Sequence, residues 1–148
     1  MLEDYCVIDL EMTGLNPKHH KILEVAEVRV RKKEIVSEGS MLIRQHQLLE
    51  EKITELTGID QEMLAGAKEE DEVLDHFFGF LGEDILVGQN VIFDYSFLKQ
   101  AAINRKMSFE RKAADTLKIA RRCLPALEKR RPRSKPIPGS PAPAAWMK

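Results

Sequence analysis

Apolar residues in the first third of the chain recur in short runs with a period of two, which is typical of β-strands. The first run begins with Tyr-Cys-Val-Ile, and two longer alternating runs follow it. Polar positions around His19-His20 and Lys32-Lys33 separate the runs and suit hairpin connections. The pattern therefore predicts three neighbouring antiparallel strands: Tyr5–Leu10, Ile22–Arg31 and Ile35–Ile43.

After the third run, apolar residues recur at spacings of three and four, which favours amphipathic helices, with short β-branched runs between them. An aromatic stripe over residues 73–81 is typical of a helix that buries one face. No segment repeats. In chain order, the predicted elements are a helix around Leu49–Leu56, a short helix from Asp60 to Leu64, a helix over residues 73–81, a strand Ile85–Val87, a helix Phe93–Arg105, a strand near Ala113-Ala114 and a helix Thr116–Cys123.

Two acidic residues, Asp9 and Glu11, stand at the end of the first predicted strand. Side chains two apart on a strand point to the same face, so both carboxylates would lie together. Neighbouring carboxylates raise each other's pKa unless a cation or a shared proton offsets the repulsion. Their hard oxygen atoms suit Mg²⁺ or Mn²⁺. Asp-x-Glu is also a common surface pair, so this motif alone is weak.

A second acidic position, Asp94, falls in the first turn of the helix that follows strand Ile85–Val87. An anionic side chain is electrostatically favoured at that end of a helix, so Asp94 alone also has a purely structural reading. The two motifs in one chain carry more information than either. We expect Asn90 to secure the turn and Phe97 to continue the core stripe.

The sequence resembles the DnaQ-like 3′→5′ exonucleases of the DEDD superfamily, a family that includes the proofreading epsilon subunit of bacterial DNA polymerase III. The resemblance runs from about Tyr5 to Arg130 and consists of segments that occur in the family's order. Two of them are the family's first and second motifs, Asp9-Leu10-Glu11-Met12-Thr13-Gly14-Leu15 and Asn90-Val91-Ile92-Phe93-Asp94-Tyr95-Ser96-Phe97-Leu98. The others are Ile22–Val28, Ile53–Ile59, Glu62–Leu64 and Asp115–Arg122.

The resemblance implies an α/β, ribonuclease H-like mixed sheet, with three antiparallel strands followed by parallel strands and flanking helices. It also implies hydrolysis of phosphodiester bonds at 3′ ends by two divalent ions, Mg²⁺ or Mn²⁺. The implied catalytic residues and metal ligands are Asp9, Glu11 and Asp94. Met12, Thr13, Leu15 and Phe93 match positions that contact the terminal nucleotide. Glu24 matches an acidic family position and has a second reading as a strand-surface charge.

The family's third motif, a His or Tyr with a final Asp from a downstream helix, has no match in this sequence. The last histidine, tyrosine and aspartate are His76, Tyr95 and Asp115. Residues 131–148 are basic and rich in proline, which rules out a continuous helix there. We therefore expect an incomplete exonuclease domain over residues 1–130, without the family's last helix, and a disordered tail over residues 131–148, from truncation, a frameshift or a genuine alternative terminus. Without that helix, the side chains of Leu98, Ala102, Leu117 and Leu124 should be partly uncovered.

Composition places the chain as a single-core protein. Its 148 residues are 43% hydrophobic, and no apolar run approaches the about 20 residues needed to span a bilayer. A charged start and a short first apolar run do not fit a signal peptide. Cys6 and Cys123 lack metal-site spacing, which favours reduced thiols. We expect a cytoplasmic protein without membrane contact.

The formal net charge of −1 conceals an uneven distribution, because residues 1–98 carry a net −12 and residues 99–148 a net +11. An acidic metal site beside a basic surface would have this pattern, and so would a solvated helix face. A basic surface of this kind would bind a phosphate backbone without sequence preference. The candidate residues are Arg105, Lys106, Arg111, Lys112, Lys118, Arg121 and Arg122.

Two functional classes follow. The first is a 3′→5′ exonuclease of the DNA proofreading type, acting on single-stranded 3′ ends and associated with a DNA polymerase subunit. In this class the absent third motif predicts impaired activity, and the first motif also resembles the oligoribonuclease branch, so RNA stays open as the substrate. The second class is a noncatalytic relative that binds nucleic acid or a polymerase.

Overall fold

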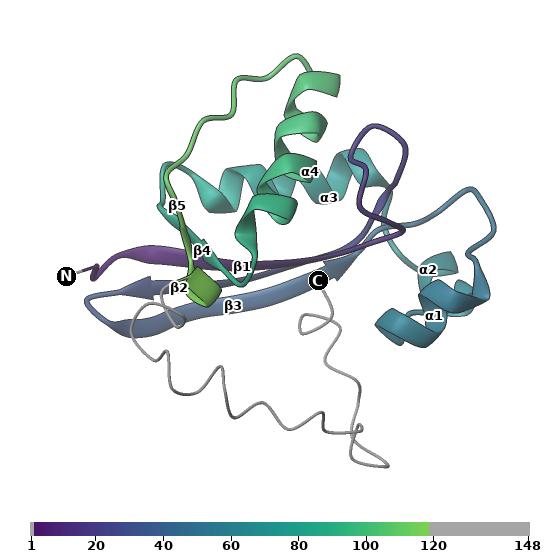
Figure 1. Cartoon of the computed structure of the whole chain (residues 1–148), viewed down its shortest axis with the longest axis horizontal. Coiled ribbons are helices and arrows are strands. Elements are labelled where there is room, and N and C mark those ends of the chain that lie inside the picture. The colour runs from purple at the N-terminus through teal and green to yellow at the C-terminus, as the bar shows by residue number, and fades with distance from the viewer. Residues whose placement is uncertain (1, 119–148) are drawn as a thin grey trace, which may run out of the picture.

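A computed structural model describes residues 2–118 of the chain. Its centre is a five-stranded mixed sheet with the strand order β3-β2-β1-β4-β5 (Figure 1). β1 pairs antiparallel with β2, and β2 with β3, whereas β1–β4 and β4–β5 are parallel. This is the predicted ribonuclease H-like arrangement. The strands are β1 (Tyr5–Met12), β2 (Ile22–Arg31), β3 (Glu34–Leu42), β4 (Leu86–Gly88) and β5 (Ala113–Asp115).

Four helices complete the order of elements in the described residues, and each lies where the apolar spacing predicts one. They are α1 (Glu51–Thr57), α2 (Gln61–Ala65), α3 (Glu70–Leu81) and α4 (Val91–Asn104). Asp60 caps α2, because its Oδ1 accepts a hydrogen bond of 2.8 Å from the Met63 amide. Residues 116–118 are helical, and the rest of the predicted helix Thr116–Cys123 lies outside the described residues, as does the predicted tail.

The hairpin between β2 and β3 turns on two lysines. Lys32 and Lys33 have φ angles of 49° and 65°, the left-handed pair that a tight two-residue hairpin requires. Lysine, unlike glycine or asparagine, has no intrinsic preference for a positive φ, so other contacts must stabilise the turn. The Lys32 amide donates to Asp4 Oδ1 at 2.9 Å and the Lys33 amide to the Glu3 carbonyl at 3.1 Å, which ties the turn to the segment preceding β1.

The main core lies between one face of the sheet and helices α3 and α4, which cover that face in Figure 1. Alternate residues of β1 from Cys6 to Met12 point into it and meet apolar residues of both helices. We expected Leu98 and Ala102 on α4 to be partly uncovered, and this prediction is wrong. Both are buried, at 0% and 1% exposure, because α4 packs on the sheet face that β1, α3 and Phe109 enclose. Leu117 is half-buried, and Leu124 lies outside the described residues.

The opposite face of the sheet is more open among the described residues. A hollow of about 470 Å³ lies against β1, β2 and β3, and Val7, Asp9, Ala26, Val28 and Ser40 are among the residues that line it. Asp9, Glu27 and Glu38 are the acidic residues among those that line it, and the rest of its lining is mostly apolar or small. The described residues contain no helix that is long and apolar enough to cross a membrane.

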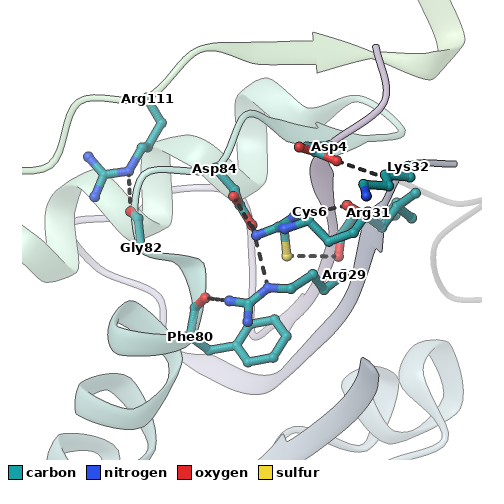
Figure 2. Close-up of polar contacts among 11 residues, drawn as sticks. Asp4, Cys6, Arg29, Arg31, Lys32, Phe80, Gly82, Asp84 and Arg111 are labelled. Carbon is teal, nitrogen blue, oxygen red and sulfur yellow. Dashed lines mark hydrogen bonds and ion pairs between the residues drawn. The ribbon is translucent and has the colours of Figure 1, made fainter. Parts of the chain in front are cut away.

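A cluster of charged side chains closes the sheet at the amino end of β1 (Figure 2). Arg31 makes two hydrogen bonds to the Asp84 carboxylate, at 2.8 and 2.9 Å, and Arg29 lies 3.6 Å from the same group. The Arg29 guanidinium also donates to the Phe80 carbonyl and lies 4.1 Å from the centre of the Phe80 ring. Asp84 precedes β4, so this cluster connects β2 to the strand beyond β1.

Burial shifts the pKa of two side chains near this cluster. Burial raises the pKa of the Cys6 thiol to about 11, with Asp84 adding to the shift. Such a thiol is a poor nucleophile, which agrees with the expectation of a reduced structural cysteine. On β2, burial also raises the pKa of the Glu27 carboxyl above its ordinary value.

Replacing Asp84 by alanine should lower the free energy of unfolding by about 1–3 kcal/mol, because two half-buried guanidinium groups lose their shared carboxylate. Urea unfolding followed by circular dichroism measures the change. Glu83→Ala is the matched control, since the Glu83 side chain is 92% exposed. Equal stabilities of the two variants would show that the cluster does not brace the sheet.

Candidate active site

The carboxylates of β1 point away from the helical core. Asp9 and Glu11 alternate with Ile8, Leu10 and Met12, which belong to that core. The two acidic side chains therefore share the opposite face, as the strand period predicts. Asp9 is half-buried and lines the hollow, whereas Glu11 is only 8% exposed.

Strand register adds a third carboxylate beside this pair. Glu24 of β2 lies directly opposite Glu11 of β1, and Ala26 lies opposite Asp9. Directly opposed residues on antiparallel strands have Cβ atoms about 4.5–5.5 Å apart. Glu24 therefore belongs to the neighbourhood of the site, which its position in the sequence alone did not establish.

Asp94 comes from the helix that follows β4, the neighbour of β1 on the side away from β2. It lies in the first turn of α4 and is 1% exposed. β4, which precedes this helix, runs parallel to β1 with Val87 opposite Val7, so Gly88 follows next to Ile8. Parallel strands bring their carboxyl ends to the same edge of a sheet. The start of α4 is thereby placed at the end of β1 that carries Asp9 and Glu11.

Gly88 permits this close approach. A Cβ atom added at Gly88 would lie 3.0 Å from the Ile8 carbonyl oxygen and 3.1 Å from Cγ2 of Val91. Asn90, with a φ of 51°, then makes the left-handed turn into the helix. Asn90 is thus a turn residue and Phe97 a core residue at 2% exposure, as expected.

Asp115 braces the same turn, a role that the sequence reading missed. Its Oδ1 accepts hydrogen bonds from the Asn90 amide at 3.1 Å and the Leu117 amide at 2.9 Å. Asp115 ends β5 opposite Gly88. The available signal was an aspartate between a strand and a predicted helix, the usual position of a helix cap.

The donor chemistry of these carboxylates suits a hard divalent cation such as Mg²⁺ or Mn²⁺. Among residues 2–118, however, no three His, Cys, Asp or Glu side chains are grouped so that they could hold a metal ion. Carboxylates repel one another, so drawing three together requires a cation or a shared proton to offset the repulsion. Convergence of Asp9, Glu11 and Asp94 on one ion therefore stays a prediction.

The residues expected to contact the terminal nucleotide differ in how much of each side chain is exposed to solvent. Leu15 is 61% exposed, so its apolar side chain is free to meet a base. Thr13 and Phe93 are half-buried. The Met12 side chain is 8% exposed and belongs to the core, which leaves its backbone for such a contact.

Two of the basic side chains proposed for phosphate binding have structural partners instead. Arg105 forms ion pairs with Asp71 and Asp75 of α3 and is only 15% exposed. Arg111 donates a hydrogen bond of 2.7 Å to the Gly82 carbonyl and lies 5.1 Å from the centre of the Phe109 ring. These two residues therefore connect helices and loops, and Arg121 and Arg122 lie outside the described residues.

Residues 6–136 match the RNase T exonuclease family. The chain belongs to this exonuclease family. It is 36% identical over 127 residues to the PolC-type DNA polymerase III of Clostridium perfringens, and 36% identical over 126 residues to the DNA polymerase III epsilon subunit of Aquifex aeolicus. These alignments cover 86% and 84% of this chain. The chain spans 9% of the PolC-type protein and 62% of the epsilon subunit.

Solved exonuclease structures share the fold. Escherichia coli exonuclease I in complex with an oligonucleotide superposes with a TM-score of 0.72 at 16% identity, covering 82% of this chain and 30% of its own. Exonuclease X in complex with duplex DNA has a TM-score of 0.64 at 23% identity, covering 97% of this chain and 88% of its own. A zinc-bound complex of E. coli exonuclease I with single-stranded DNA is also similar, with a TM-score of 0.73 at 16% identity, covering 82% of this chain and 30% of its own.

Gly88→Ala should lower the free energy of unfolding by about 1–3 kcal/mol, because the added methyl group collides with the Ile8 carbonyl and with Val91. Gly79→Ala in α3 is a matched control, since no atom lies within 4 Å of its added Cβ. That control should gain up to about 1 kcal/mol from helix propensity. Urea unfolding of both variants measures the difference, and a stable Gly88→Ala protein would show that β4 does not need this close approach.

Proposed function

We propose that this exonuclease-family chain hydrolyses phosphodiester bonds from the 3′ ends of nucleic acids. Its substrate in this proposal is DNA, and its activity is of the proofreading type. The observation that carries the proposal is the placement of Asp9 and Glu11 on one face of β1, with Asp94 at the start of the helix after the neighbouring parallel strand. Family membership and the similarity to DNA polymerase III subunits support it.

Each candidate residue has a distinct role in this proposal. Asp9, Glu11 and Asp94 would hold two divalent ions, Mg²⁺ or Mn²⁺, with Asp9 shared between them. Such ions, when bound, activate water and stabilise the charge on the leaving 3′ oxygen. Leu15 and Phe93 would pack against the base of the terminal nucleotide, and Met12 and Thr13 would contact the same nucleotide. Packing against a base tolerates any sequence, which suits removal of mismatched ends.

A polymerase subunit is the partner that the relatives suggest, and the cytoplasm is the location that replication implies. The chain aligns with segments of PolC-type DNA polymerase III proteins, in which it corresponds to about 9% of the length. We propose that single-stranded 3′ ends reach the hollow around Asp9, the open side of the sheet in the described residues.

Two alternatives have specific support. A noncatalytic role in binding nucleic acid or a polymerase is favoured by the lack of a His, Tyr or Asp after Asp115 in these 148 residues. An oligoribonuclease-like activity on RNA is favoured by the Asp-Leu-Glu-Met-Thr-Gly motif. Parallel assays on DNA and RNA strands of one sequence separate these readings.

A polypeptide of these 148 residues should release mononucleotides only slowly from a 3′-labelled single strand in Mg²⁺ or Mn²⁺. The expected deficit is about 10²–10⁴-fold relative to a homologue with a general base, because the third-motif His or Tyr is absent. A 5′-labelled strand should give a ladder of shortened products, which establishes the direction of hydrolysis. Asp9→Ala should abolish the residual release, whereas Glu34→Gln should not.

Release at a rate comparable with such a homologue, lost in Asp9→Ala, would show that the third motif is not needed. Release that persists in Asp9→Ala would place the chemistry elsewhere or reveal a contaminating nuclease. No release from DNA or RNA, combined with measurable strand binding, would favour the noncatalytic alternative.

Titration calorimetry without nucleic acid should detect weak binding of only one of the two proposed divalent ions, because the third-motif Asp that would complete the other ion's site is absent from the sequence. The binding should be tighter for Mn²⁺ than for Mg²⁺. Mn²⁺ binds oxygen ligands with higher affinity and less demanding geometry than Mg²⁺. Asp9→Asn should lose the binding heat, and Asp60→Asn, which changes a helix cap remote from β1, should retain it. Equal binding heats for the Asp9→Asn variant and the parent chain would show that Asp9 is not a metal ligand.

A further inference from the structure

The loop between β1 and β2 holds Thr13, Gly14 and Leu15 directly after the site carboxylates. Its two ends are pinned together, because the Thr13 amide donates to the Lys21 carbonyl at 2.9 Å and Thr13 Oγ1 accepts from the Lys21 amide at 2.9 Å. The register of β1 with β2 also shifts between Glu11 and Met12. The loop therefore starts from a rigid base.

Asn16 organises the far end of the loop. Its carbonyl oxygen accepts hydrogen bonds from the His19 amide at 3.1 Å and the His20 amide at 2.8 Å. Its side-chain Oδ1 accepts from the Lys18 amide at 3.0 Å. This is the local pairing by which an asparagine side chain stabilises a turn.

His20 links the two ends of the loop. Its Nδ1 accepts a hydrogen bond of 3.0 Å from the Asn16 amide, so the assigned neutral tautomer has its proton on Nε2. Its ring lies flush against Gly14: an added Cβ there would lie 2.5 Å from Cδ2 and 2.6 Å from Cγ and Cε1. Only glycine fits beneath this ring, and the contact fixes the backbone on which Leu15 is exposed.

We propose that His20 is a positioning residue that holds the Thr13–Lys21 loop in the conformation that receives the 3′-terminal nucleotide. The inference rests on the proposed exonuclease function. Leu15, exposed beyond the ring-covered Gly14, is the side chain that the loop presents. A loop ordered before binding loses less conformational entropy when substrate arrives, so His20 raises affinity for a terminus without touching it.

Three substitutions separate the two contacts of the ring. His20→Phe keeps an aromatic ring over Gly14 and removes the acceptor, and His20→Asn keeps an acceptor near the position of Nδ1 and removes the ring. Gly14→Ala displaces the ring from the other side. His19→Asn is the matched control, because the His19 side chain is next to His20 in the sequence and is exposed.

The first measurement is amide hydrogen exchange by NMR in the full chain without substrate. The Asn16 amide should be protected in the parent chain and in His19→Asn. It should exchange about three- to tenfold faster in His20→Phe, which matches the loss of one net hydrogen bond, and His20→Asn should restore part of the protection. An Asn16 amide that exchanges equally in all these chains overturns the proposed loop contact.

The second measurement compares fluorescence anisotropy of two labelled oligothymidylates in Mn²⁺. One is linear with a phosphorothioate at its 3′-terminal linkage, and the other is a circle of the same length. His20→Phe and Gly14→Ala should weaken binding of the linear strand about three- to tenfold and leave the circle unchanged. A general loss of folding would weaken both and lower the melting temperature.

The two ideas fail in distinguishable ways. If the parent chain binds linear and circular strands equally, the proposed 3′-end function fails, and with it the role of His20 toward a terminus, whatever the exchange data show. If the parent prefers the linear strand and the His20 and Gly14 variants keep that preference, the proposed function stands and His20 is not a positioning residue.

Discussion

The parallel pairing of β1 with β4 is the constraint on which the rest of the structure depends. A parallel pair requires a crossover, and here the crossover contains α1, α2 and α3. It also aligns the carboxyl end of β4 with that of β1, so the helix after β4 begins near the acidic residues of β1. Gly88 lets the strands meet without a side chain between them. Two short motifs separated by about half the chain become neighbours through this one pairing.

The helical core explains which face of the sheet is available for chemistry. Side chains along β1 alternate between the two faces of the sheet. Ile8 and Leu10 therefore pack in the core, whereas the candidate site residues Asp9 and Glu11 lie on the opposite face. Leu98 and Ala102 were expected to be partly uncovered because the family's missing C-terminal helix would have covered them. α4 instead packs with α3 on the helical face of the sheet, where both side chains are buried without that helix. The helix contributes Asp94 only through its first turn.

Much of the fold and part of the site could be predicted from the sequence. Periods of two and of three to four residues located β1, β2, β3 and the amphipathic helices, because burial of one face of an element produces these periods. The three-residue strands β4 and β5 are too short to show a period and were predicted from short runs between helices. Side-chain contacts between distant segments produce no periodic pattern in the sequence. Strand register decides whether Arg29 and Arg31 meet Asp84. It also places Glu24 opposite Glu11. The loop conformation decides the contact of His20 with Gly14. None of these follows from a local pattern.

The separation of the two sheet faces also affects how such a chain can diverge. Side chains on the open face contribute little to the core that α3 and α4 complete, so their replacement costs little folding free energy. Positions such as Val28 and Ser40 can therefore change more freely, while the alternating residues beside them in each strand stay under packing constraint. Within a single strand, neighbouring positions are thus expected to evolve at different rates.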